Sequence, residues 1–188
     1  MINVKKTKKE FLMYLLKKPI NKILDIGCGK GLMSKFFHKK RAKAIGIDIQ
    51  EISEDSENFK FIKGDIRKED FGKENDLIIA SLILHVFNRE DALKIINRMK
   101  DATSKEGHNF LICMSNEDEL AKKKTEKFYP SFQELIEIYD NWHLVKEVSG
   151  ITEIEDHDDI GPHQHNLILL LFQKREKQRI SKNANTYI

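Results

Sequence analysis

Three glycines at alternate positions form the segment of this chain with the clearest chemical implication. They lie in residues 25–31 (DIGCGKG), at the end of an apolar run and just before an amphipathic stretch. Glycine tolerates positive φ and has no Cβ, and the start of a helix favours an anionic group, so a ligand can lie against this backbone. A dinucleotide fingerprint reads GxGxxG, but Leu32 stands at the last glycine position, which disfavours pyrophosphate. The segment predicts a ligand-binding turn, although a tight turn without a ligand has the same pattern.

Two acids stand at the ends of the next two apolar runs. Asp48 closes residues 44–48 (AIGID), and Asp65 follows residues 59–63 and Gly64. Because parallel strands end at one edge of a sheet, both carboxylates are expected beside the glycine turn, where one can accept the hydroxyls of a ribose. Each acid alone also fits a solvated strand end or a helix cap. Together with the glycines they predict a nucleoside pocket.

The elements that must position these residues alternate between short apolar runs and amphipathic stretches, which is typical of an α/β fold with parallel strands. Strands are expected at 22–26, 44–48, 59–62, 76–80 and 109–114, and helices at 7–17, 31–39, 89–102 and 131–139. The runs 142–148 and 166–173 have no helical pattern between them, so they are expected to pair antiparallel at one edge. The connection after Asp48 is short, so its helix is expected to be reduced to a turn.

With these motifs in order, the chain resembles the class I S-adenosylmethionine-dependent methyltransferases over about residues 20–115. The segments DIGCGKG, GIDI and KGD stand at the three cofactor motifs of that family, and NDLIIAS stands at the fourth. The resemblance implies a doubly wound, Rossmann-like fold. In that fold a mostly parallel seven-stranded sheet carries an antiparallel edge strand and has helices on both faces.

The resemblance also implies a set of residues that bind S-adenosylmethionine: Asp25, Gly27, Cys28, Gly29, Gly31, Asp48, Ile49, Asp65, Ile66 and Ser81. The three glycines of this set would accommodate the methionine moiety, with Asp25 near its ammonium group. Asp48 would hold the ribose diol.

The remaining members of the set would surround the adenine and the sulfonium. Asp65 would accept from the adenine amino group, while the Ile66 N–H would meet the ring and Ile49 would pack on its face. Ser81 would lie beside the sulfonium.

The acceptor of the methyl group is less constrained by the sequence. The C-terminal third carries FYPSF at residues 128–132, then Glu134-Leu135, Tyr139, Trp142 and Val145-Lys146, and a final strand expected to end at Lys174. On these residues it resembles the small tellurite-resistance and related thiol or chalcogen methyltransferases, which implies a thiol, a chalcogen oxyanion or a similar small acceptor. His85 is the one candidate catalytic residue, as a base or an orienting group, and a structural histidine is the alternative. Methyl transfer is an in-line displacement that depends mainly on alignment, so an acid–base pair is not required.

Residues 157–165 hold three histidines and several acids close together. Such a segment could bind a divalent metal or form a lid over the site, but a solvated loop is the preferred interpretation, and no metal is expected.

Size, charge and cysteine content limit the other possibilities. The 188 residues fit one domain, expected at 1–175 with 1–19 as a helix packed on it, while 176–188 form a polar tail expected to be disordered. A net charge of +3 with interspersed signs disfavours nucleic acid as a partner. Two separate cysteines, no targeting signal and no membrane-length apolar run indicate a cytoplasmic protein without a membrane partner. A methyltransferase for protein or RNA, and a silent S-adenosylmethionine-binding regulator, remain as alternative functions.

Overall fold

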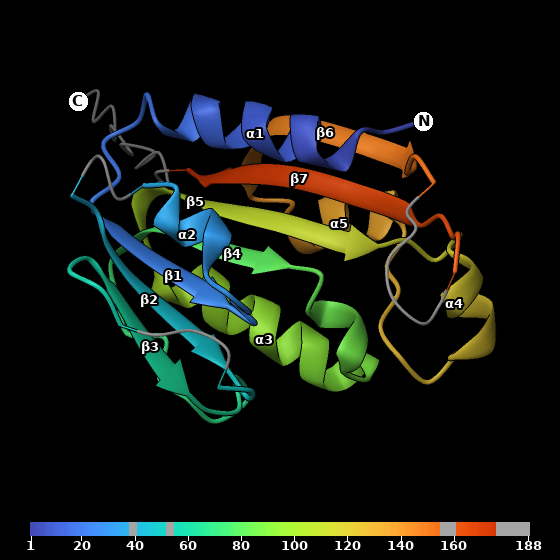
Figure 1. The fold of residues 1–188 in the computed structure, drawn as a ribbon, viewed down its shortest axis with the longest axis horizontal. Helices are drawn as coiled ribbons and strands as arrows, with labels where there is room; N and C mark the ends of the chain where they lie inside the picture. Colours follow the sequence, from blue (N-terminus) through green and yellow to red (C-terminus); the bar gives the residue numbers. More distant parts are fainter. Residues whose placement is uncertain (38–40, 52–54, 155–160, 176–188) are drawn as a thin grey trace, which may run out of the picture.

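A seven-stranded sheet forms the centre of the chain in the computed structural model, which describes residues 1–37, 41–51, 55–154 and 161–175 (Figure 1). Its strand order is β3-β2-β1-β4-β5-β7-β6. The strands are β1 (Lys22–Ile26), β2 (Lys43–Asp48), β3 (Phe59–Lys63), β4 (Asn75–Ser81), β5 (Thr103–Met114), β6 (Trp142–Ile151) and β7 (Asn166–Lys174). The order reverses between β1 and β4, and such a switch point is where doubly wound sheets bind ligands.

The pairing of the strands confirms the predicted mixed sheet. Strands β3, β2, β1, β4 and β5 pair parallel to one another. Strand β7 pairs antiparallel with β5 on one side and with the edge strand β6 on the other. The run Leu167–Phe172 is buried throughout, as expected for a strand that is covered on both faces.

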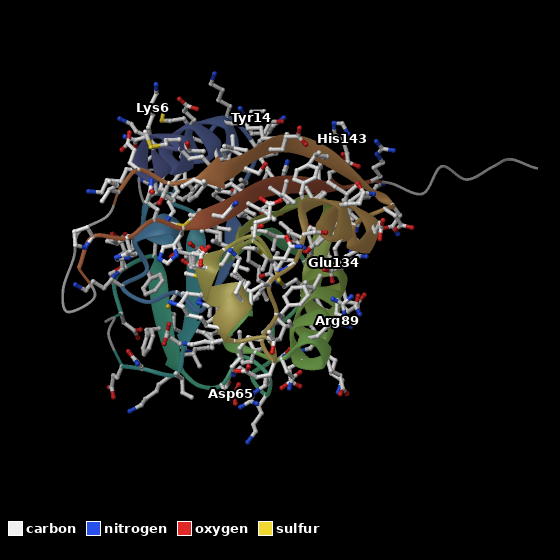
Figure 2. The ribbon with its side chains drawn as sticks, turned by 90° about the vertical axis from the view of Figure 1, so that its right-hand side faces the viewer. Lys6, Tyr14, Asp65, Arg89, Glu134 and His143 are labelled. Atoms are coloured by element: carbon white, nitrogen blue, oxygen red, sulfur yellow. The ribbon has the colours of Figure 1, made fainter. Side chains whose placement is uncertain are left out.

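Helices cover both faces of the sheet, and a separate apolar core lies between the sheet and the helices on each face (Figure 1). They are α1 (Val4–Leu15), α2 (Leu32–Lys35), α3 (Arg89–Ala102), α4 (Glu119–Lys123) and α5 (Phe132–Ile138), with a 3₁₀ turn η2 (Leu84–Val86). Phe11 of α1 stacks on Phe110 of β5 with the ring centroids 5.0 Å apart. On the opposite face, Arg89 of α3 and Glu134 of α5 form an ion pair (Figure 2). The predicted α/β architecture with helices on both faces is therefore confirmed.

Several element ends differ from the prediction. Helix α1 begins at Val4 because the side chain of Asn3 caps it by accepting from the Lys6 N–H. Helix α2 ends at Lys35, within the expected 31–39, because the N–H groups of Phe36 and Phe37 bond three residues back and tighten the last turn. Residues 38–40 lie outside the described part of the chain.

Two other connections bear on the site. Strand β5 begins at Thr103, directly after α3, and is longer than the expected 109–114. The described residues between β2 and β3 form turns and no helix, as the short connection predicted. The tail expected at 176–188 lies outside the described residues.

None of the helices in the described ranges is long and apolar enough to cross a membrane.

Candidate functional site

The glycine turn lies at the carboxyl end of β1, between the ends of β2 and β4. Gly27, Gly29 and Gly31 have φ of 65°, 52° and 65°, which confirms the need for glycine at all three positions. The Gly27 N–H donates to the Ile47 carbonyl at 2.8 Å, so the turn is fixed to β2 from its first residue. The backbone here is shaped by the glycines and held by the neighbouring strand.

Two of these glycines also make room for side chains of the protein itself. A Cβ on Gly27 would lie 2.4 Å from Ile83, and one on Gly31 would lie 2.7 Å from the ring of Phe59. The sequence predicted that a methionine moiety would lie against these glycines, and it did not predict the contact between Gly27 and Ile83. The absence of a Cβ at Gly27 is therefore needed by Ile83 whether or not a ligand is bound.

Asp48 ties the glycine turn to the end of β2. Its Oδ2 accepts from the Gly29 N–H at 2.9 Å, and its Oδ1 accepts from the Gln50 N–H at 3.0 Å. A carboxylate offers about four acceptor positions, so two remain for a ligand. This geometry brings together the two motifs that the sequence placed at one sheet edge.

A cavity of about 130 Å³ opens beside Asp48 at the ends of β1, β2, β3 and β4. It is lined by Gly27, Asp48, Ile49, Gly64, Asp65, Ile66, Arg67, Ile83, Val86 and Phe87. Ligand pockets usually measure about 300–1,000 Å³, so this cavity has room for only a ring-sized part of a larger ligand. Its walls are mostly apolar, with carboxylates at the rim, which suits a purine attached to a ribose.

Two isoleucines that line this cavity differ in exposure. Ile49 is 67% exposed, a high value for an apolar side chain, and would be covered by a ring packed on it. Ile66 is buried in the core, and its backbone N–H has no acceptor among the residues that the structure describes. A buried donor without a partner is costly, so a ring nitrogen at this place would satisfy it.

Asp65 lines the same cavity, but its carboxylate is engaged by Arg67. The guanidinium lies 2.6 Å from Oδ2, and the Arg67 backbone N–H donates to Oδ1 at 2.9 Å. These bonds lower the pKa of Asp65 to about 2, so it is ionised at neutral pH. Figure 2 shows Asp65 at the opposite end of the molecule from Lys6. Sequence reasoning missed Arg67, although its spacing of two residues from Asp65 was a usable signal.

The other two members of the turn lie deeper. Asp25 is 3% exposed, and burial raises its pKa to about 7, partly offset by hydrogen bonds from Ser34 and increased by the charge of Asp48. Cys28 packs against the core on the α1 side of the sheet, and burial raises its thiol pKa to about 12. Neither residue lines the cavity described above.

The chain turns sharply after β4. Ser81 ends the strand opposite Ile112, and Leu82 has a φ of 54°, a strained value for a residue with a side chain. This bend places Ile83 over Gly27 and starts the η2 turn that carries His85. Ser81 thus lies at the predicted sheet edge, at the base of the bend.

His85 is half-buried and is not among the residues that line the cavity. Its ring stacks against Tyr129, with the centroids 6.1 Å apart. Burial lowers its pKa, aided by repulsion from His165 when that ring is protonated and from Lys124, and opposed by Asp118. His85 is therefore neutral at pH 7 and can accept a proton.

The histidine-rich segment is described only from residue 161 onward, so both of its acids, Asp158 and Asp159, and its first histidine, His157, lie outside the described residues. The His163 and His165 rings lie 5.0 Å apart. Within the described ranges, no group of three or more His, Cys, Asp or Glu side chains is arranged to hold a metal ion.

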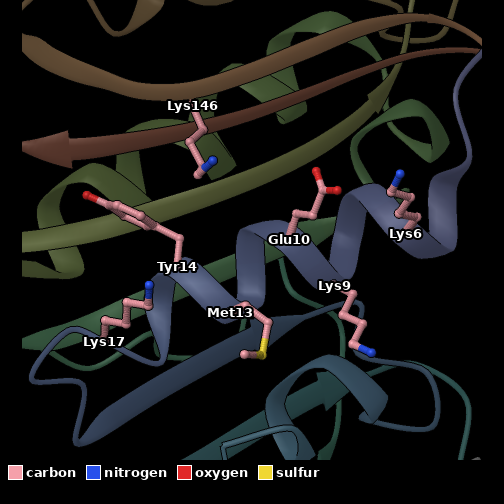
Figure 3. A pocket seen from close by; sticks show the side chains of 7 residues that line it. All are labelled: Lys6, Lys9, Glu10, Met13, Tyr14, Lys17 and Lys146. Atoms are coloured by element: carbon pink, nitrogen blue, oxygen red, sulfur yellow. The ribbon is translucent and has the colours of Figure 1, made fainter.

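The lysines near the N-terminus border a separate hollow of about 550 Å³ along α1 (Figure 3). It is lined by Lys6, Lys9, Glu10, Met13, Tyr14, Lys17 and Lys146 and shares no residue with the cavity at the strand ends.

Comparison with known proteins relates this site to a family. The sequence model of the family described as "Tellurite resistance protein TehB" matches residues 13–172. The chain belongs to the TehB family. The match spans the glycine turn, both acids, η2 and the β6–β7 pair.

Relatives within and around the TehB family agree with this assignment. A probable S-adenosyl-L-methionine-dependent methyltransferase TehB of Haemophilus influenzae is 24% identical over 154 residues, which cover 74% of this chain and 52% of that protein. The chain thus spans about half the length of this curated relative.

Solved structures share the fold. The crystal structure of TehB from Haemophilus influenzae has a TM-score of 0.73 at 20% identity, covering 89% of this chain and 62% of that one. The N-methyltransferase NodS from Bradyrhizobium japonicum, in complex with S-adenosyl-L-homocysteine, has a TM-score of 0.69 at 14% identity, covering 92% and 87%.

Proposed function

We propose that this TehB-family chain transfers a methyl group from S-adenosylmethionine to a small acceptor such as a thiol or a chalcogen oxyanion. The observation that carries the proposal is the Asp48 carboxylate, which joins the glycine turn to β2 at the rim of a ring-sized cavity. Residues 1–175 would form one cofactor-binding unit.

The proposal keeps the cofactor-binding roles that the family resemblance implies. Asp48 would bind the ribose hydroxyls, while Ile49 and the Ile66 N–H would hold the adenine in the cavity. The glycine turn would lie against the methionine moiety, with Asp25 beneath it. Asp65, held by Arg67, would accept from the adenine amino group.

When bound, S-adenosylmethionine supplies a methyl group activated by its sulfonium. The task of the chain is then to align the acceptor, and alignment alone can lower a barrier by about 7–11 kcal/mol. The residues after β4 and β5 lie at the same sheet edge as the glycine turn and are placed to do this. Cys28 would have a packing role in the turn, because burial holds its thiol protonated.

Transfer of a labelled methyl group to a panel of thiols, selenite, tellurite, a protein mixture and small RNAs tests the proposal. We expect label in the thiol or oxyanion products, and loss of both transfer and cofactor binding in Asp48→Ala and Gly29→Val. Glu51→Gln is the matched control, because Glu51 is an exposed acid three residues away that pairs only with Lys63 within the described chain. Label confined to protein or RNA would contradict the small acceptor, and tight binding without any transfer would indicate a silent regulator.

A further inference from the structure

Four ionisable side chains gather near the end of β5, beside the turn that borders the cofactor cavity. This cluster, called here the imidazole cluster, consists of His85, Asp118, Tyr129 and His165. Ile83, Val86 and Phe87 of the η2 turn line the cavity, while His85 of the same turn packs on Tyr129. The cluster therefore adjoins the cofactor site without being part of it.

Asp118 is the fixed point of the imidazole cluster. It is only 2% exposed, and its Oδ1 accepts from the Leu120 N–H at 2.8 Å as the cap of α4. Its Oδ2 accepts from the Asn166 N–H at 2.8 Å and lies 3.2 Å from Nδ1 of His165. A helix cap needs one oxygen, so the second oxygen is left to hold the start of β7 and the imidazole.

His165 is held from two sides. Its backbone N–H donates to the Thr152 hydroxyl at 3.0 Å, and its carbonyl accepts from the Thr152 N–H at 2.8 Å. An ionised carboxylate can only accept, so the contact with Asp118 places the ring proton on Nδ1. Nε2 is then left as a lone-pair acceptor, and it has no partner within the described chain. The side chain remains 19% exposed, so a small molecule can reach it.

His85 and Tyr129 form a second pair of rings close enough to feel the charges of the first pair, since Asp118 acts on both and His165 acts on His85. The Nδ1 of His85 is buried and has no hydrogen-bond partner among the described residues. Burial lowers the pKa of His85 and raises that of Tyr129, so both side chains are neutral at pH 7. This surface places imidazole rings beside a buried carboxylate, which favours an acceptor carrying a proton over an anion.

We propose that His165, oriented by Asp118, removes the proton from a neutral acceptor such as a thiol, with His85 and Tyr129 forming the wall of the acceptor site. This inference rests on the proposed function. The S–H proton passes to Nε2 of His165, and the freed electron pair of the acceptor sulfur forms the new S–CH₃ bond. The CH₃–S⁺ bond of S-adenosylmethionine breaks at the same time, and its electron pair stays on the cofactor sulfur, which gives neutral S-adenosylhomocysteine. The imidazolium then returns its proton to water.

Two thiols separate base catalysis from alignment. With 2-mercaptoethanol, which carries its proton at neutral pH, we expect His165→Gln to lower kcat/KM about 10²–10⁴-fold. With 4-nitrothiophenol, which is already ionised, the loss should be less than tenfold. Affinity for S-adenosylhomocysteine by calorimetry should stay within twofold. His143→Gln is the matched control, because His143 is an exposed histidine of β6 that contacts Arg175.

Asp118 is a positioning residue, and its role has a readout that is independent of turnover. Nitrogen-15 NMR of the histidine rings should show His165 with its proton on Nδ1, and Asp118→Asn should shift it toward Nε2. Asp118→Asn also removes the negative charge that stabilises protonated His165. His165 should then lose its proton at lower pH, so the fall in kcat/KM on the acid side of the pH profile should move to lower pH. Among the residues that the structure describes, the other ionisable groups near His165 include His85 on η2 and His163 on its own segment, with Lys124 and Tyr129 beyond them.

The outcomes distinguish this inference from the proposed function. Equal losses with both thiols, an unchanged rate in His165→Gln, or a proton on Nε2 in the wild-type protein would overturn the inference. Transfer to selenite or tellurite without thiol turnover would also overturn it, while leaving the proposed function in place. Failure of the wild-type protein to bind S-adenosylhomocysteine would overturn both.

Discussion

Asp25 is a carboxylic acid enclosed in the first strand, and its ionisation is coupled to the stability of the fold. Its pKa rises from 3.8 to about 7 on burial, so the folded protein binds this proton more tightly than the unfolded chain. The resulting stabilisation is complete below the unfolded pKa and is lost as pH rises through the folded pKa. Asp25 therefore lowers the free energy of unfolding as pH increases from about 4 to about 7.

Replacement of Asp25 by Asn, which cannot ionise, should remove this dependence. Wild type should lose roughly 2–3 kcal/mol of unfolding free energy between pH 5 and pH 8 through this ionisation, and Asp25→Asn should not. The stability of the variant minus that of wild type should therefore rise by that amount from pH 5 to pH 8. Urea unfolding of both proteins at the two pH values measures the double difference. A difference that does not change with pH would show that Asp25 ionises normally in the folded state.

The residues that the sequence identified and those that it missed differ in a physical respect. Asp48 and Asp65 could be identified from the sequence because the local order of strand and turn fixes the position of an acid at a strand end. Arg67 was missed although it contacts Asp65 from only two residues away, whereas Ile83 meets the glycine turn only after folding, in a position that depends on the strained φ of Leu82. No composition or spacing rule predicts such a bend in an apolar run.

At the scale of elements, the contact between the glycine turn and the η2 turn supports a direct test. Gly27→Ala combines a left-handed backbone with a clash against Ile83. Gly161→Ala is the matched control, because Gly161 has a similar φ of 72° and no described residue has an atom within 4 Å of its added Cβ. The control should lose about 1–2 kcal/mol of unfolding free energy and Gly27→Ala distinctly more. Equal losses in chemical denaturation would contradict the packing of Ile83 on the turn.

Element types were predictable where the pattern was strong. Helix α3 occupies the expected residues 89–102, and the predicted antiparallel pair became β6 and β7. Element ends depended on tertiary contacts. Strand β5 extends back to Thr103, whose hydroxyl bonds the Met99 carbonyl and the Asn109 side chain, and no local apolar pattern marks that extension.

At the scale of the whole molecule, we propose that the carboxyl edge of the sheet binds one S-adenosylmethionine. The switch in strand order between β1 and β4 places the glycine turn, Asp48 and the cavity at that edge. The imidazole cluster lies at the neighbouring strand ends, so cofactor and acceptor would meet along one edge.

Calorimetric titration of the wild-type chain with S-adenosylhomocysteine tests this claim most directly. The structure predicts saturable binding of one ligand per chain, with no binding of NAD because the last glycine of a dinucleotide turn is Leu32. Absence of binding heat with S-adenosylhomocysteine, or saturable binding of NAD in its place, would contradict the account.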